Sequence, residues 1–382
     1  MCIRDRPKTQ VSTIAKFLGY EEEIKEDGTK VVHYNYNQIK NGPSPNVLII
    51  DECSMISIAQ LEALKETKIN IIFVGDICQI NPVSEDISQV FNCNFLGKAS
   101  LIKNERIKNP ELKETILNYR DSVIKGHLLK KCIESPARIN NRDQFNKELL
   151  TSFHENDETV FIAWTNVQVK EYNLFLRNSL FNDPKEPYVS GERLQFNNYY
   201  KGTKHNFYSG QKVTIDECEK VERVIFFPNC MCNNSNYKVI HTERPECSYK
   251  INKCEKCKTP SSMSNYKTFD FWKITLVGHE EEYFLKPVEG MKNIYPIIYK
   301  YRDRCKALKN KIEWRRYYDI IDILNTPLEY SYSISVHKAQ GSGYDNVFVD
   351  LENIMFCQNT QERLRLAYTA VSRARENLYF LK

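Results

Sequence analysis

Short, unbroken apolar runs recur along the chain and predict strands. They lie at 47–50, 70–74, 159–164, 346–349 and 378–381. Runs of Val, Ile, Leu and Phe without polar interruption are typical of parallel strands buried on both faces. Helical patterns lie between them, at 57–67, 109–126, 166–181 and 360–374. Strand alternating with helix predicts an α/β fold, and the long helical stretch after the first two strands favours two parallel-sheet domains.

Two segments interrupt this alternation. Residues 20–46 contain a predicted hairpin that turns at Asp27-Gly28. Residues 190–330 combine short alternating strands, a cysteine-rich patch and a charged, helix-favouring stretch near 300–323, which predicts a small β-rich insertion. The leader MCIRDR joins poorly to the residues after it and is left out of the fold prediction. The predicted domains are residues 1–98 with the hairpin, 99–189, the insertion at 190–330, and 331–382, which completes the second parallel-sheet domain.

The composition is that of a globular protein. Hydrophobic residues make up 41% and charged residues 27% of the 382 positions, which argues against disorder. The net charge of +5 is only a weak indication of a polyanionic partner. No apolar stretch approaches the length of a membrane span and no signal peptide opens the sequence, so we expect no membrane partner.

The thirteen cysteines predict an intracellular, reducing compartment, because they occur without a secretory signal. Four of them form a C-x-C pair and a C-x₂-C pair: Cys230, Cys232, Cys254 and Cys257. Two such pairs are able to close a tetrahedral Zn²⁺ site that would staple the insertion. Free thiols in a loop are the alternative.

Carboxylates follow two of the predicted strands. Asp51 and Glu52 end the run VLII, and Asp76 follows IIFVG. Ligands of an open parallel sheet bind beyond the carboxyl ends of its strands, where such acids are placed to hold Mg²⁺ and orient water. Acids also favour helix N-termini, and the carboxylates alone leave that alternative open.

Four segments, found in a fixed order along the chain, favour the nucleotide-site interpretation of these carboxylates. The chain resembles superfamily 1 helicases at motifs II, III, V and VI, in the segments VLIIDECSMI, VGDICQINPV, SISVHKAQGSGYDNV and LAYTAVSRARENLYF. The resemblance is closest to the RecD-like and Dda-type branch, which moves 5′→3′ on single-stranded DNA. Four further segments are similar to other parts of these helicases. STIAKFLGY resembles the segment after motif Ia, and NERIKNPEL resembles motif IV. FIAWTNVQVKEYN resembles the strand and helix after motif IV, and FYSGQKVTI resembles an SH3-like insertion. The resemblance implies two RecA-like parallel-sheet domains, the first incomplete, with a hairpin insertion at the position of a strand-separating pin and an SH3-like β-rich insertion.

The resemblance implies a role for each motif residue at the nucleotide. Asp51 would ligate Mg²⁺ and Glu52 would activate water. Gln79 would sense the γ-phosphate. Arg106 and Arg373 would neutralise charge on the transferred phosphoryl group.

Further motif residues are expected to connect the nucleotide with DNA. Gln340 and Gly341 would lie near the nucleotide. The expected DNA contacts are Thr13, Thr165, Asn166, Ser335, His337 and Lys338. The alternatives are helix-cap or turn roles for the first three and a structural role for His337.

One helicase element is missing from the sequence. Nothing fits the phosphate loop G-x-x-x-x-G-K-[ST], and LGKAS at 96–100 lacks the upstream glycine. Ala15 also stands where the family usually has His. The expectation is an N-terminally truncated helicase that binds ATP poorly and hydrolyses it negligibly.

The sequence therefore predicts an ATP-dependent 5′→3′ DNA helicase that acts as a monomer on single-stranded DNA and duplex junctions. Its expected cofactors are ATP and Mg²⁺, with a structural Zn²⁺ if the cysteine pairs close. The alternative is a non-catalytic single-stranded DNA-binding protein derived from a helicase. The presence of Glu52, Gln79 and Arg373 argues against that alternative, since a protein released from catalysis need not keep three phosphate-facing groups.

Overall fold

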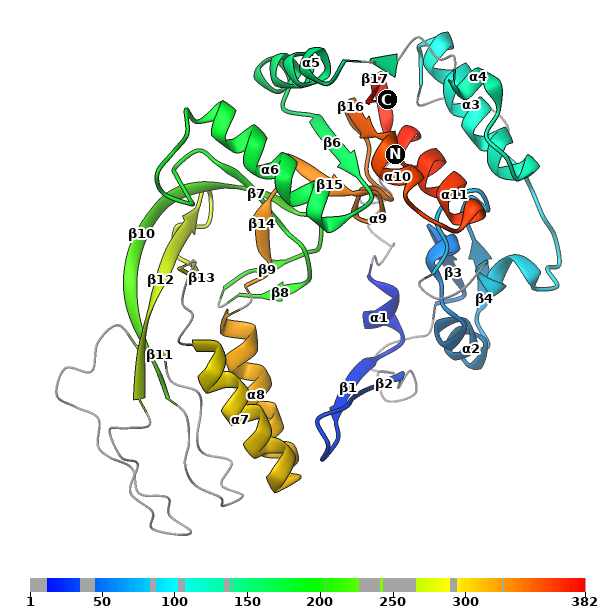
Figure 1. Ribbon diagram of the computed structural model, residues 1–382. Helices are drawn as coiled ribbons and strands as arrows, with labels where there is room; N and C mark the ends of the chain where they lie inside the picture. The colour runs from blue at the N-terminus through cyan, green and yellow to red at the C-terminus, as the bar shows by residue number, and fades with distance from the viewer. Residues whose placement is uncertain are drawn as a thin grey trace. The chain divides into compact units, whose positions relative to one another are not determined.

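The structure is a computed structural model with two compact units (Figure 1). The first comprises Met1–Tyr20, Tyr34–Pro184 and Ser331–Lys382, and the second Glu21–His33 and Lys185–Tyr330. The structure describes residues 12–34, 45–82, 87–101, 107–133, 138–139, 141–202, 204–226, 241–242, 266–288, 294–324 and 326–381.

The larger sheet of the first unit has five strands, all parallel. Its order is β15 (Ser333–Ser335), β6 (Thr159–Ala163), β16 (Tyr344–Asp350), β17 (Ala374–Leu381) and β5 (Arg138–Ile139). The surrounding helices are α3 (Pro110–Lys125), α4 (Lys130–Ile133), α5 (Arg142–Glu155), α6 (Asn166–Leu180), α9 (Val336–Ala339), α10 (Leu351–Met355) and α11 (Thr360–Val371). The predicted strands and helices are present, whereas β5, β15, α4, α5, α9 and α10 were not predicted.

Helices cover both faces of this sheet (Figure 1). On one face, Phe348 packs against Phe145 of α5, with ring centroids 5.3 Å apart. On the other, Val347 and Val349 join a core cluster with residues of α3 and α11. Since successive strand residues point to opposite faces, burial on both sides explains the unbroken apolar runs of the sequence. The predicted parallel α/β architecture is confirmed.

The first unit also contains a second, two-stranded parallel sheet. It pairs β3 (Val47–Ile50) with β4 (Asn70–Phe73), joined through α2 (Ile58–Glu66). Ser57 and Gln60 form a capping box that fixes the start of α2. Only one face of this sheet is buried, together with α1 (Ile14–Phe17) and the short helices η3 (Cys53–Met55) and η4 (Gln89–Asn92).

The second unit is built on an antiparallel sheet. Its main order is β13 (Tyr283–Pro287), β12 (Tyr266–Leu276), β10 (Lys212–Phe226), β7 (Arg193–Phe196) and β14 (Leu328–Tyr330), with β11 (His241–Thr242) on β10. A separate pair is β8 (Tyr200–Lys201) and β9 (Asn206–Phe207). The helix-favouring stretch forms two helices, α7 (Ile294–Leu308) and α8 (Lys311–Leu324). The β-rich character is confirmed, while the SH3-like assignment and the predicted domain boundaries stay predictions.

The predicted hairpin is present and its tip packs on α8. Strands β1 (Tyr20–Ile24) and β2 (Lys30–Tyr34) turn at Asp27-Gly28 as expected. Gly28 has φ +87°, and a Cβ there would lie 2.5 Å from Cε2 of Trp314. The indole Nε1 of Trp314 donates to the Glu26 carbonyl at 2.9 Å, and the Tyr318 hydroxyl donates to the Gly28 carbonyl at 2.8 Å. Glycine is required here by both the backbone conformation and the indole beneath it.

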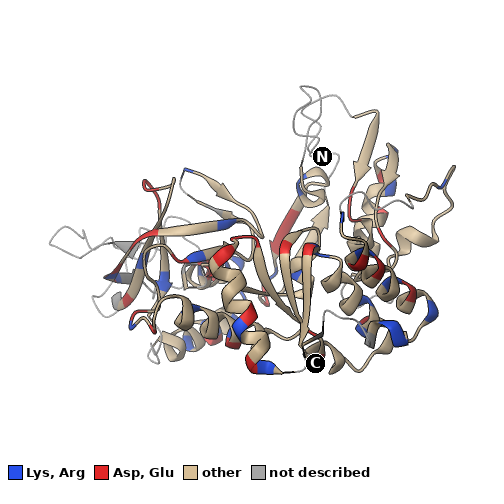
Figure 2. Ribbon diagram, turned by 90° about the horizontal axis from the view of Figure 1, so that it is seen from above, with Lys and Arg blue, Asp and Glu red and all other residues tan. Residues whose placement is uncertain are grey.

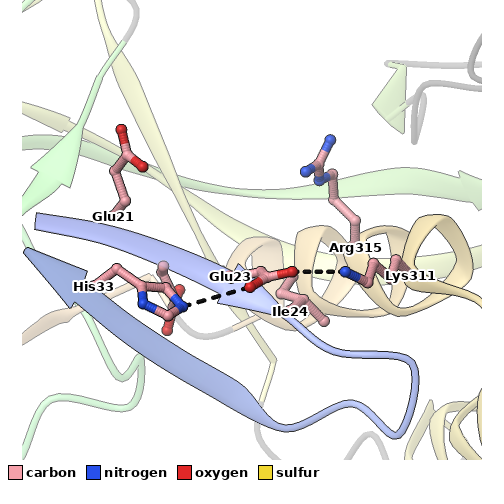
Figure 3. Close-up of a pocket in the computed structure, with 7 residues that line it drawn as sticks. Glu21, Glu23, Ile24, His33, Lys311 and Arg315 are labelled. Atoms are coloured by element: carbon pink, nitrogen blue, oxygen red, sulfur yellow. Dashed lines mark hydrogen bonds and ion pairs between the residues drawn. The ribbon is translucent and has the colours of Figure 1, made fainter. Parts of the chain in front are cut away.

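A small pocket lies beside this contact, lined by side chains of the hairpin and of α8 (Figure 3). Glu23 is its central group. Lys311 Nζ lies 2.6 Å and His33 Nε2 3.4 Å from the Glu23 carboxylate. The hydrogen bond and charge of Lys311 lower the pKa of Glu23. Of the hairpin aromatics, Tyr34 packs against the core of the two-stranded sheet, and Tyr36 lies outside the described residues.

Charge does not by itself locate a binding surface. Lys and Arg are spread over the elements together with Asp and Glu (Figure 2). Among the helices of the described ranges, none combines the length and apolar character needed to cross a membrane.

Candidate functional site

Asp51 and Glu52 lie where β3 ends, as predicted. Asp51 is exposed, and its Oδ1 accepts a hydrogen bond from the Glu52 amide at 2.9 Å. Glu52 has φ +52° and ψ +43°, a left-handed conformation that costs a non-glycine residue about 1–3 kcal/mol. The next amide, of Cys53, donates to the Val74 carbonyl at 2.9 Å. The loop after β4 therefore helps to hold the strained backbone that presents the Glu52 carboxylate.

The loops after β3 and β4 approach each other closely at Gly75. A Cβ on Gly75 would lie 2.7 Å from the Cys53 sulfur and 3.0 Å from the Cys53 amide nitrogen. Burial raises the pKa of Cys53 to about 11, so its thiol is neutral at physiological pH. The absence of a side chain at Gly75 is what lets the two loops pack together.

Asp76, the third strand-end acid, is engaged with the larger sheet's helices. Its Oδ2 accepts a hydrogen bond from the Tyr368 hydroxyl of α11 at 2.6 Å, and Nη2 of Arg120 in α3 lies 3.6 Å from Oδ1. Its Oδ1 also accepts from the Cys78 amide at 3.0 Å. Burial, and then the Asp76 charge, raise the pKa of Tyr368, which keeps its hydroxyl protonated. Asp76 thus anchors the loop that leads to Gln79.

Helix α11 also binds this loop through a second residue, Arg365. Arg365 donates from Nη1 to the carbonyl oxygens of Ile77 and Gln79, the latter at 3.1 Å. Within the part of the chain that the structure describes, the buried Oε1 of Gln79 has no hydrogen-bond partner. A buried, unsatisfied amide oxygen is costly, and it is suited to accept a hydrogen bond from a ligand or its water.

Gln340 and Gly341 lie beside the carboxylates, although they are far away in sequence. Gln340 Nε2 donates to Ser54 Oγ at 3.1 Å, and its Oε1 is buried without a partner among the described residues. Gly341 has φ +76°, and a Cβ on it would lie 3.9 Å from Glu52 Oε1. The structure therefore brings the predicted motif II and motif V residues together.

Arg373 is buried next to this group, with a relative exposure of 3%. Its guanidinium donates to the carbonyl oxygens of Thr369 at 3.0 Å and Ser342 at 3.1 Å, and to Ser372 Oγ at 2.9 Å. The contact with Ser342 ties it to the residue after Gly341. Its role in neutralising phosphoryl charge stays a prediction. Arg106 and the four cysteines Cys230, Cys232, Cys254 and Cys257 lie outside the described residues.

The predicted DNA-contact residues of motif V lie at the junction of β15 and α9. Ser335 is buried, His337 partly buried and Lys338 exposed. Burial lowers the pKa of His337, so at neutral pH it offers an N–H group rather than a charge. Lys338 is then the cation of this junction.

The other predicted DNA contacts start helices. Thr13 Oγ1 accepts from the Lys16 amide at 3.2 Å and caps α1. Thr165 caps α6, and its Oγ1 also accepts from Asn353 Nδ2 at 3.0 Å. Asn166 is exposed in the first turn of α6. The helix-cap alternative is therefore realised for both threonines, which leaves their DNA contact an untested prediction.

Sequence reasoning missed the residues that hold the site together. They are Ser54, Arg120, Asn353, Arg365 and Tyr368. Arg365 and Tyr368 are three positions apart on α11, which places both on one face, and this spacing was the available signal. The sequence gave no such signal for Asn353, which is a single buried polar residue.

Two family models match the ends of the chain. The model described as UvrD-like helicase C-terminal domain matches residues 330–381, and the model described as AAA domain matches residues 1–85. These ranges contain the motif II carboxylates and the Arg373 segment.

Several known proteins are similar over most of the chain. An uncharacterized protein of Acanthamoeba polyphaga mimivirus is 24% identical, covering 98% of this chain and 82% of the relative. The RecBCD enzyme subunit RecD of Buchnera aphidicola subsp. Schizaphis graminum is 25% identical, over 96% of this chain and 58% of the relative. Among solved structures, Pif1 helicase from Bacteroides in complex with ADP-AlF3 and ssDNA has a TM-score of 0.44 and 13% identity, with 96% and 78% of the two chains covered. Pif1 helicase from Candida albicans has a TM-score of 0.43 and 16% identity, with 88% and 72% covered.

The family assignment rests on the ordered motifs and on the two family models that enclose them. The similarity to RecD agrees with both. These matches support the resemblance to superfamily 1 helicases of the RecD-like branch that the sequence predicted.

Proposed function

We propose that the protein is an ATP-dependent DNA helicase that translocates 5′→3′ on single-stranded DNA and unwinds duplexes at junctions as a monomer. The observation that carries the proposal is the convergence of Gln340 and Gly341 on Ser54 and Glu52. Four motif residues from opposite ends of the chain gather beyond the carboxyl end of β3, where a parallel sheet binds its ligand.

The residues present fit magnesium and ATP. Asp51 is exposed at the strand end and would hold Mg²⁺, while Glu52 would orient the attacking water. The Oε1 atoms of Gln79 and Gln340 have no hydrogen-bond partner among the described residues and are ready acceptors for the water or donor groups of such a ligand. Bound ATP with Mg²⁺ supplies the phosphoryl group whose transfer releases the energy for movement.

The direction of movement is supported by motif V, which resembles the RecD-like branch. Ser335, His337 and Lys338 would contact a DNA phosphate, with Lys338 supplying the charge. A duplex with a 5′ tail should therefore be unwound and one with a 3′ tail should not. Unwinding of the 3′-tailed substrate alone would overturn the proposed direction.

The 382 residues alone are proposed to bind single-stranded DNA but to hydrolyse ATP negligibly, because they contain no G-x-x-x-x-G-K-[ST] loop. The experiment compares these residues with a fusion that adds a phosphate loop from a related helicase to their N-terminus. DNA-stimulated hydrolysis is expected only from the latter, and Glu52→Gln should abolish it while DNA binding is retained. Ordinary hydrolysis by the 382 residues would contradict the proposed inactivity. Its absence from both proteins would favour the non-catalytic binding protein.

Zinc in the cysteine pairs, and an intracellular location, remain part of the proposal. Metal analysis of the purified protein tests the first directly. About one equivalent of zinc is expected, and less than about half an equivalent would remove this part of the proposal.

A further inference from the structure

Two tyrosines of the second unit stand exposed next to each other. Tyr199 is 56% and Tyr208 55% exposed, and their ring centroids are 5.8 Å apart at an interplanar angle of 56°. They flank the strand pair β8–β9, in which Tyr200 pairs with Phe207. Tyr199 and Tyr208 are the next facing positions beyond that pair, so their rings are neighbours on the outer surface.

The backbone that carries these rings is anchored from below by other aromatic side chains. Phe207 is fully buried and stacks on Phe196, with centroids 4.5 Å apart. The ring centroid of Phe284 lies 5.1 Å from that of Phe207 and 5.6 Å from that of Tyr200. Inner and outer aromatics thus alternate along both strands, as expected of a surface with one buried and one exposed face.

Hydrogen bonds hold the Tyr199 ring and the backbone of Tyr208. The Tyr199 hydroxyl donates to Asn206 Oδ1 at 3.0 Å, and the Tyr208 amide donates to Gln211 Oε1 at 3.1 Å. Gly210 has φ +80°, and its amide donates to the Phe196 carbonyl at 2.7 Å. A ligand that binds these rings would lose little affinity to ordering them.

The strand pair and the neighbouring turn carry charges of both signs. Residues 197–212 contain three lysines and one histidine, and no Asp or Glu. The neighbouring turn supplies three acids, each with a partner. Glu280 accepts from the Gly278 amide, Glu281 pairs with Lys204, and the buried Glu282 accepts from the amides of Lys204 and His205.

We propose that Tyr199 and Tyr208 form a stacking platform for the bases of a single-stranded nucleic acid. Every base presents a π-face, so an exposed aromatic pair binds a strand without selecting its sequence. The platform is a contact additional to the motif V junction and rests on the proposed nucleic-acid function. Each ring is expected to strengthen binding about tenfold.

The experiment measures the fluorescence anisotropy of labelled oligo(dT) with the 382-residue chain in the absence of nucleotide. Tyr199→Ala and Tyr208→Ala should each weaken binding about tenfold, whereas Tyr208→Phe, which keeps the ring, should bind like the wild type. Tyr295→Ala is the matched control, because Tyr295 is 59% exposed on α7 of the same unit. The dependence of affinity on salt should stay unchanged in all four variants, because no phosphate contact is removed.

A second probe separates stacking from loss of structure. An oligonucleotide with abasic positions should bind the wild type more weakly than oligo(dT), and the alanine variants should distinguish the two probes less. Unfolding midpoints equal to that of the wild type exclude a folding defect.

The outcomes separate this inference from the function on which it rests. If the wild type binds no oligonucleotide, the proposed function fails and the platform fails with it. If the wild type binds and both alanine variants bind equally well, only the platform is overturned. Unchanged DNA binding with altered self-association in gel filtration would assign the rings to a protein interface and also overturn it.

Discussion

The two parallel sheets of the first unit serve the same site but are covered very differently. In the five-stranded sheet, Phe161, Val347 and Phe348 are fully buried between two layers of helices. In the two-stranded sheet, Ile49 and Ile72 remain 56% and 52% exposed. Both sheets nonetheless place motif residues beyond the carboxyl ends of their strands.

The difference shows where the rigidity of the site originates. The two-stranded sheet has one buried face and cannot alone fix its loops as firmly as a sheet covered on both faces. Tyr368 and Arg365 of α11 bind the loop after β4, and Gln340 binds Ser54 after β3. Helices of the fully covered sheet therefore position the motif residues that follow the strands of the half-covered one.

The largest expected effect is a loss of stability, which should be much greater for a buried strand residue of the five-stranded sheet than for an exposed one of the two-stranded sheet. Phe348→Ala should lower the free energy of unfolding by about 3–5 kcal/mol, because it removes a ring packed against Phe145 and Tyr379. Ile49→Ala should change it by less than about 1 kcal/mol, because that side chain is half exposed. Urea denaturation, with hydrogen exchange of β16 amides as the local reporter, measures both. Equal losses would mean that the exposed face of β3 is buried in solution.

A second prediction concerns the close approach of the two loops. Gly75→Ala should cost about 1–3 kcal/mol, because its Cβ would meet the Cys53 sulfur and backbone. Gly97→Ala is the matched control, since no heavy atom of the described ranges lies within 4 Å of a Cβ there. Hydrogen exchange of the amides of residues 52–56 should rise in the first variant only. Unchanged exchange in both would show that the loops separate easily.

A third prediction tests the bridge from α11. Tyr368→Phe should cost about 1–2 kcal/mol, because it removes a buried hydrogen bond to the Asp76 carboxylate. Exchange of the amides of residues 76–80 should increase while β16 amides stay protected. Tyr379→Phe is the control, a partly buried tyrosine whose ring stacks on Phe348. If Tyr368→Phe leaves residues 76–80 unchanged, Arg120 and Arg365 hold this loop without the tyrosine.

The sequence predicted the parts of the fold whose burial pattern is simple. Unbroken apolar runs located β3, β4, β6, β16 and β17, and Asp27-Gly28 located the hairpin turn. Helix α5 was missed although its buried residues Phe145, Leu149 and Phe153 recur every four positions, the spacing of one helix face. The helix-favouring stretch contained two helices, because a left-handed Lys309 and the cap-like Asn310 separate α7 from α8.

For the site, the sequence identified the motif residues but not their supports. Strand ends and motif order were sufficient for Asp51, Glu52 and Gln340. The contacts of Tyr368 with Asp76 and of Arg365 with the Gln79 loop join residues 286 or more positions apart. No local pattern encodes such a pairing, which depends on how two sheets and a helix meet in three dimensions.

The smallest expected effect lies at the junction of β15 and α9, in the fully covered sheet. Burial lowers the pKa of His337 in the folded state, so below its ordinary value of about 6.5 the unfolded chain binds a proton that the folded chain resists. The stability of the wild type should therefore fall as the pH drops from 7.5 to 5, and His337→Gln should reduce that slope. His127→Gln, at an exposed position, is the control and should follow the wild type. Urea midpoints across this pH range measure the slopes. A slope that His337→Gln leaves intact would assign the pH dependence to other groups and show that the imidazole is solvated in solution, as the side chains on the open face of β3 and β4 are.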